Sequence, residues 1–119
     1  MDKIPQSDPT LKAYFNVLNR RYWKGKLPGN TVVRWVSARS LRVKKMSAWG
    51  AFYYWDEERT QPVIELNDEL RKREWDSTAE GTLLHEMVHL EGKGRDNHGK
   101  VFDKRMLRIA KLGAFHHVW

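Results

Sequence analysis

The sequence predicts a small α+β domain with an N-terminal helix, a three-stranded and mostly antiparallel sheet, and two further helices. Three observations lead to it. Apolar residues recur at three- and four-residue spacing near the N-terminus, three short β-branched and aromatic runs follow, and two apolar helical segments complete the chain. A chain of 119 residues has room for one core, so we expect a single domain over 1–119 with its core at about 9–113.

The first helix is predicted from its start signal and its apolar stripe. Ser7-Asp8-Pro9 is typical of an N-cap followed by Pro at the first helical position. The helix should run to about residue 22, with a core-facing stripe formed by Leu11, Tyr14, Phe15, Leu18 and Tyr22. The stretch 24–30, Lys-Gly-Lys-Leu-Pro-Gly-Asn, predicts a turn.

Three strands are predicted from runs rich in β-branched and aromatic residues, namely Thr31–Val36, Ala48–Trp55 and Pro62–Asn67. Gly50 inside the second run indicates a bulge or a close approach of the backbone to another element. The basic stretch Ala38–Ser47 is expected to form a loop or part of a hairpin. The charged stretch Glu69–Asp76 predicts a short helix or a loop.

The most informative stretch is His85-Glu86-Met87-Val88-His89, an H-E-x-x-H motif. Residues four apart lie on one face of a helix, so His85 and His89 can direct two imidazoles at one metal ion. Glu86 lies beside the first ligand, where it can reach a metal-activated water as general base. By itself the motif also occurs in unrelated helices, as two partly exposed histidines flanking a solvated glutamate.

The surroundings of the motif favour a metal helix. Apolar residues precede and follow the motif, so its histidines are not expected on an open surface. Ser77-Thr78-Ala79-Glu80 forms a capping box that can begin the helix. Gly92 and Gly94 can end it.

A catalytic zinc ion usually takes three protein ligands and a water, so a third ligand is expected. His98 follows a glycine-containing turn and should open the last helix, about 97–112, on the same inward edge as Phe102. The alternative is a capping or surface histidine. The metzincin spacing would place its last histidine at position 95, which is Arg95 here. Weaker ligand candidates are Glu91, Asp96, His116 and His117.

The charge of the chain is unevenly distributed around a net value of +7. Residues 9–55 hold ten Lys and Arg and no acid, whereas residues 56–91 hold eleven acids and four bases. A basic surface can serve solubility alone. The acid-free run favours an anionic partner, most simply nucleic acid. Its candidate contacts are Arg20, Arg21, Arg39, Arg42, Lys44 and Lys45.

Cysteine is absent, so neither disulfides nor a cysteine-type zinc site are available. We find no signal-peptide pattern and no apolar run of membrane-spanning length. These absences favour a cytoplasmic protein with no membrane partner, either free or associated with the nucleoid, or a nuclear one in a eukaryote. We expect a monomer.

Several motifs together resemble one family over Leu11–Leu112. They are Y-F-N-V-L-N-R-R-Y-W (14–23), G-K-L-P (25–28), W-G-A-F-Y (49–53), I-E-L-N (64–67), T-L-L-H-E-M-V-H (82–89) and H-G-K-V-F (98–102). In this combination the sequence resembles the SprT-like metalloproteases.

The resemblance implies a zincin-like minimal metalloprotease domain with one Zn²⁺ ion, ligands His85, His89 and His98, and Glu86 as the base. Spartan-type relatives cleave proteins crosslinked to DNA and are switched on by DNA. The resemblance thus implies a zinc endopeptidase for DNA-associated or DNA-crosslinked proteins. We expect DNA, single-stranded or with single-stranded character, as a partner. This chain lacks the cysteines of the zinc ribbon found in many relatives, so any DNA contact is expected from the catalytic domain itself.

We expect the protein or peptide substrate to pair with an edge strand above the metal helix, at Trp49, Gly50, Ala51, Phe52 and Tyr53. Oxyanion-stabilising candidates are Tyr53, Tyr54 and Arg95. The alternative function is a nucleic-acid-binding module with a structural zinc site and no protease activity. A structural site would more typically be closed by four ligands.

Overall fold

The computed structural model describes residues 4–44, 48–71, 77–95 and 98–114. In chain order the elements are α1 (Pro9–Trp23), β1 (Val32–Val36), α2 (Ala38–Val43), β2 (Gly50–Tyr54), β3 (Pro62–Asn67), the 3-10 turn η1 (Asp68–Leu70), α3 (Ser77–Glu91) and α4 (Lys100–Lys111). The predicted α+β fold class is confirmed. Within the described residues, no helix is both long and apolar enough to cross a membrane.

The sheet has the strand order β1-β3-β2, and every residue of the central strand β3 is buried. Strand β2 pairs with β3 in antiparallel fashion, whereas β1 pairs with β3 in parallel. The sheet is therefore mixed, and not mostly antiparallel as predicted. The difference arises because the chain leaves β1, passes through α2 and β2, and returns beside β1 with β3 as the inserted strand. Strand composition carries no signal for that order.

Helix α1 begins as predicted. The Asp8 carboxylate accepts a 2.9 Å hydrogen bond from the Leu11 backbone N–H, and Pro9 takes the first helical position. Beyond the helix, the Asn19 side chain exchanges two hydrogen bonds with the Leu27 backbone, at 3.1 and 3.2 Å. This pairing fixes the predicted turn over residues 24–30.

Helix α2 corrects the prediction of a loop or hairpin over Ala38–Ser47. The Ser37 hydroxyl accepts from the Ser40 N–H at 3.1 Å, which caps the helix, and Leu41 is fully buried. A six-residue helix places only one or two residues in the core, which is too few to show a helical period in the sequence. Its basic residues therefore made the stretch resemble a loop. Lys45 and the rest of 45–47 lie outside the described residues.

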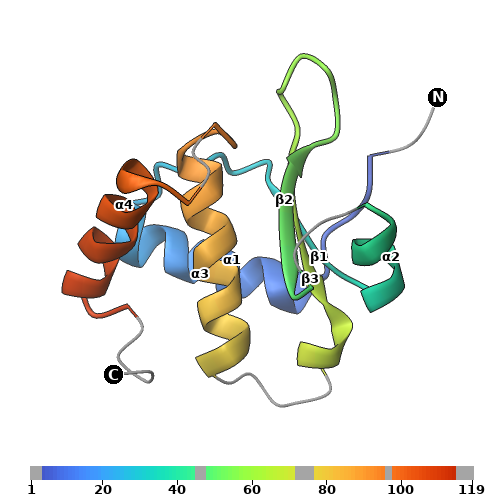
Figure 1. Ribbon diagram of the computed structural model, residues 1–119, viewed down its shortest axis with the longest axis horizontal. Coiled ribbons are helices and arrows are strands. Elements are labelled where there is room, and N and C mark those ends of the chain that lie inside the picture. The colour runs from blue at the N-terminus through green and yellow to red at the C-terminus, as the bar shows by residue number, and fades with distance from the viewer. Residues whose placement is uncertain (1–3, 45–47, 72–76, 96–97, 115–119) are drawn as a thin grey trace.

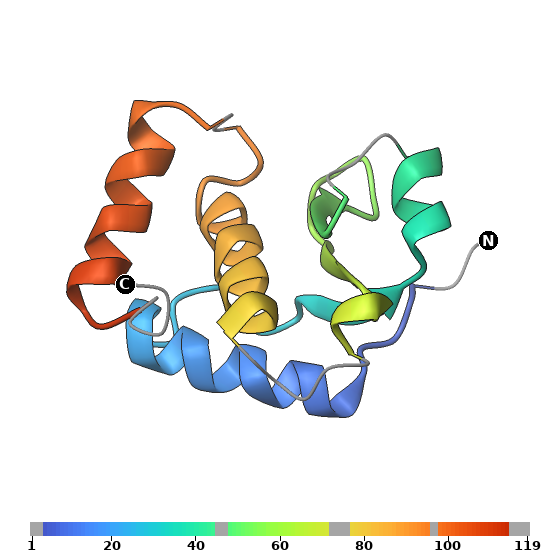
Figure 2. The same cartoon turned by 60° about the horizontal axis from the view of Figure 1, so that its bottom comes forward.

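Helix α3 runs alongside β2, with α4 on the side away from the sheet (Figure 1). Figure 2 shows α1 crossing beneath α3. The core between them holds fully buried apolar side chains, among them Phe15, Ile64, Leu83, Leu84 and Met87. Helix α3, which carries the H-E-x-x-H motif, is thus packed against both the sheet and α1.

Helix α3 ends where the glycines predict. The Gly94 N–H donates to the His89 carbonyl at 2.9 Å, and Gly94 has the left-handed φ of +70°. Helix α4 begins at Lys100, so His98 lies in the connection before it and not within the helix. Three of the weaker ligand candidates, Asp96, His116 and His117, lie outside the described residues. The side chain of Ser77, the first residue of the predicted capping box, is not described either.

Candidate metal centre

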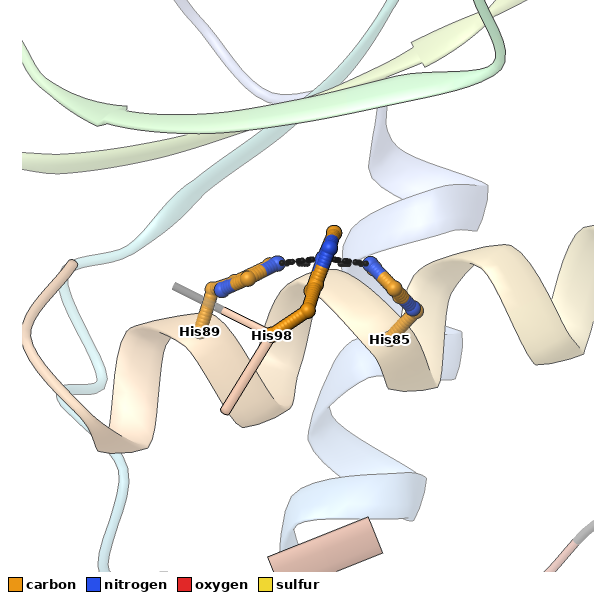
Figure 3. A group of neighbouring side chains, drawn as sticks. All are labelled: His85, His89 and His98. Atoms are coloured by element: carbon orange, nitrogen blue, oxygen red, sulfur yellow. Dashed lines mark hydrogen bonds between the residues drawn. The ribbon is translucent and has the colours of Figure 1, made fainter. Parts of the chain in front are cut away.

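Three imidazoles meet between α3 and the sheet (Figure 3). The Nε2 atoms of His85 and His98 are 3.0 Å apart, as are those of His89 and His98, and those of His85 and His89 are 3.3 Å apart. Nitrogen ligands about 2.05 Å from a tetrahedral zinc ion would be about 3.3 Å from one another. The three side chains therefore fit a single metal ion, and zinc is compatible with an all-imidazole set.

The ring of Phe102 packs against all three imidazoles. Its centroid lies 5.0 Å from that of His85, 4.6 Å from His89 and 4.8 Å from His98. Phe102 sits in the first turn of α4 and is only 5% exposed. Docking of α4 through this ring therefore couples the position of His98 to the two histidines of α3.

His85 is in the form that binds metal. Burial, together with the neighbouring His89 and His98, lowers the pKa of His85 to about 4. A neutral imidazole keeps a lone pair for a metal ion, whereas a protonated one does not. At neutral pH His85 is therefore available as a ligand.

Glu86 lies under the start of β2. It is buried, and a Cβ atom built at Gly50 would come within 3.1 Å of its Oε2 atom. The close backbone approach predicted from Gly50 is thus observed, and the register of β2 continues through it without a bulge. Burial raises the pKa of the Glu86 carboxyl to about 8. A divalent cation at the histidines would oppose that shift by favouring the carboxylate.

The SprT-like family profile matches residues 11–117, nearly the whole chain. The chain belongs to the SprT-like family. Its domain therefore has a metalloprotease-like fold, and the three histidines form the cluster suited to bind metal in that fold. A search of curated proteins found no match.

In this SprT-like domain, β2 lies at an edge of the described sheet, above the imidazoles (Figure 3). Alternation along the strand places Gly50 and Phe52 toward α3, where they meet Glu86 and Gly94. Tyr53 points to the other face. Its hydroxyl hydrogen-bonds the Glu65 carboxylate at 2.9 Å, so the prediction of Tyr53 as an oxyanion group is wrong.

Glu91, a weaker ligand candidate in the sequence, stands apart from the histidine cluster. It accepts a 2.6 Å hydrogen bond from Trp23 Nε1 and two hydrogen bonds from Arg108, at 2.5 and 2.9 Å, with Arg105 Nε 3.4 Å away. The carboxylate thereby ties together the last turns of α1, α3 and α4. No sequence signal links Trp23 to Glu91, 68 residues later.

The predicted nucleic-acid contacts do not form one patch. Arg20 and Arg21 are exposed in the last turn of α1, and Arg39 and Arg42 are exposed on α2. Figure 2 shows these two regions at opposite ends of the molecule. Lys44 is held in a 2.7 Å ion pair with Glu65.

Proposed function

We propose that this SprT-like domain is a zinc endopeptidase that acts on DNA-associated or DNA-crosslinked proteins. The observation that carries the proposal is the convergence of His85, His89 and His98 on one point beside a buried Glu86. Three nitrogen ligands leave a fourth position for water or substrate, which is the arrangement of catalytic zinc sites. A structural site would normally be closed by a fourth protein ligand.

Glu86 is the general base in this proposal. When bound, zinc supplies a Lewis acid and lowers the pKa of a water molecule. Glu86 accepts the proton of the attacking water at its carboxylate and delivers it to the leaving amine. Burial against Gly50 restricts the carboxylate to a small volume and excludes competing solvent.

Strand β2 is the surface on which an extended substrate would be bound. An edge strand offers main-chain donors and acceptors to a further strand, so a peptide can pair with it directly. Trp49, 49% exposed just before β2, adds apolar contact surface beside it. These features favour a polypeptide as the substrate.

The choice of DNA-associated proteins rests on the resemblance to Spartan-type enzymes and on the exposed arginines of α1 and α2. Phosphate contacts from Arg20, Arg21, Arg39 and Arg42 would confer no base sequence preference. Because the two arginine pairs lie at opposite ends of the molecule, they would contact separate stretches of nucleic acid.

The test compares wild type with Glu86→Gln for zinc content and for cleavage of a DNA-binding protein, with and without single-stranded DNA. Glu57→Gln, in the exposed hairpin turn, is the matched control. We expect zinc in all three proteins and cleavage in wild type and Glu57→Gln only. If all three hold zinc and none cleaves, the nucleic-acid-binding module with structural zinc becomes the better description. A rate increase with DNA would assign the arginines to substrate delivery.

A further inference from the structure

A cavity of about 980 Å³ opens at the carboxyl end of α3. Its walls are the end of α1 with the 24–28 turn, the β2–β3 hairpin, the end of α3, and α4. It includes Leu90, the residue after ligand His89, and Arg95, three residues before His98. The lining of the cavity thus includes sequence neighbours of two ligands, although it includes none of the three histidines.

The cavity is strongly basic. Two acids line it, Glu58 and Glu91, and the second is already bound by Arg108. Against them stand six cationic side chains, namely Lys24, Lys26, Arg59, Lys93, Arg95 and Arg108. These positive charges line a concave surface, so they attract anions more strongly than the same charges would on a convex surface.

One wall of the cavity is fixed by contacts between the hairpin and the turn after α3. The Arg59 guanidinium lies 4.9 Å over the ring of Tyr54 and donates to the Lys93 carbonyl. A Cβ atom at Gly94 would lie 3.2 Å from the Phe52 ring, so hairpin and turn are in close contact. The hairpin that follows β2 is thus fixed against the turn after α3, and Tyr54 at the end of β2 lines the cavity.

The position of the cavity along β2 sets which substrate residues can reach it. Glu86 meets β2 at Gly50, so the scissile bond lies near that residue, and Tyr54 at the cavity is four residues further on. That interval is about 13 Å of strand. Antiparallel pairing with β2 is the more stable choice for an incoming strand. The substrate would then enter the cavity with residues about four to six positions before the scissile bond.

We propose that this cavity binds acidic side chains of the substrate on the N-terminal side of the scissile bond. This inference adds a substrate preference to the proposed function. It rests on that function, because the proposed cleavage at Glu86 sets the direction of the substrate along β2. A single-stranded nucleic acid fits less well, because base stacking needs bare aromatic faces. Tyr22 and Trp23 are each only 6% exposed, and the ring of Tyr54 is covered by Arg59.

Binding is measured with the zinc-loaded full chain carrying Glu86→Gln, so that no probe is consumed. The probe is a labelled peptide with Asp and Glu at the fourth to sixth positions before the cleavage site, compared with the same peptide carrying Asn and Gln there. Lys24→Glu/Lys26→Glu reverses two cavity charges. Arg20→Glu/Arg21→Glu makes the same change in net charge on α1, outside the cavity.

We expect the acidic peptide to bind about tenfold more tightly than the neutral one, and the cavity variant to lose about tenfold while the α1 variant loses less than about twofold. Equal losses in both variants would reduce the effect to net charge and overturn the inference. Equal binding of both peptides would overturn it as well. The inference would also be overturned if the acidic peptide did not bind and the cavity variant instead lost affinity for a thymidine oligonucleotide.

Cleavage by the wild-type enzyme separates this inference from the proposed function. A peptide with its acidic residues moved to the C-terminal side should be cut about tenfold more slowly than the first peptide. Equal rates for the two would contradict the inference while leaving the endopeptidase intact. If the wild type cuts neither peptide, the proposed function fails, and the binding measurement on the Glu86→Gln protein still decides whether the cavity takes acidic side chains.

Discussion

Gly50 on β2 and Glu86 on α3 are packed so closely that a Cβ atom at position 50 would lie 3.1 Å from Glu86 Oε2. It would also lie 3.1 Å from Thr82 Cγ2 and 3.3 Å from the Glu65 carbonyl oxygen. The absence of a side chain at Gly50 thus lets the edge strand lie directly on the proposed general base. The helix that carries two of the three histidines and the strand proposed to bind substrate meet at this contact.

Gly50→Ala should therefore impair catalysis more than metal binding. The added methyl group must displace the Glu86 carboxylate or β2 by a few tenths of an ångström, and we expect kcat to fall by about tenfold. Zinc content should remain at one ion per chain, since none of the three atoms nearest to a Cβ at Gly50 belongs to a histidine. Gly29→Ala is the control, because nothing lies within 4 Å of a Cβ there. Unchanged kcat in Gly50→Ala would show that Glu86 does not need its present position.

Zinc should stabilise the folded chain through the three histidines. At a free zinc concentration 100 times the dissociation constant, the gain is about 2.7 kcal/mol, or roughly 10 °C in Tm for a domain of this size. His98→Ala should lose most of this gain. Without metal, its Tm should be nearly that of the metal-free wild type, because His98 lies in an exposed connection. Differential scanning calorimetry with chelator and with zinc measures both values. A full zinc shift in His98→Ala would place the third ligand elsewhere, with Asp96, His116 and His117 as the candidates to substitute next.

Glu91 should matter for stability and for holding α4 in place. Glu91→Gln keeps an acceptor for Trp23 Nε1 but removes the charge that Arg108 and Arg105 face. Because the arginines are partly exposed, we expect a loss of about 1 kcal/mol in the free energy of unfolding. Zinc affinity should fall as well, since α4 carries Phe102 against the imidazoles. Urea unfolding and zinc titration report the two effects, and Glu57→Gln should change neither.

Glu65 gives the fold a dependence on pH in the acid range. Burial by itself would raise the pKa of this carboxyl, but hydrogen bonds from Lys44, Arg34 and Tyr53 outweigh it and hold the pKa below the ordinary value of 4.5. A carboxyl with a lowered folded pKa contributes stability that is complete above the unfolded pKa. That contribution is lost as the pH falls through the folded pKa.

Glu65→Gln should accordingly lose about 2 kcal/mol at pH 7, because the cations of Arg34 and Lys44 lose their partner. Below pH 4.5 the stability of the variant should change less steeply than that of the wild type. Urea unfolding of the zinc-free proteins between pH 3 and pH 7 measures both. Parallel pH curves for the two proteins would mean that other carboxylates govern the acid transition.

Local features of the sequence were sufficient for much of this molecule. The Asp8-Pro9 cap, the apolar stripe of α1 and the glycine that ends α3 act over a few residues, and each was predicted correctly. The helical spacing of His85 and His89 is likewise a local property, so the metal motif could be recognised before any fold was known.

Only the tertiary structure decided which distant residues meet. The parallel pairing of β1 with β3, the direction of Tyr53 away from the metal centre, and the bond from Trp23 to Glu91 depend on packing between elements far apart in sequence. The arginines of α1 and α2 belong to one acid-free run of sequence, yet the fold separates them, and a basic cavity forms instead from side chains of four segments. Periodicity reports which face of an element is buried, whereas the partner of that face is set by packing of the whole chain.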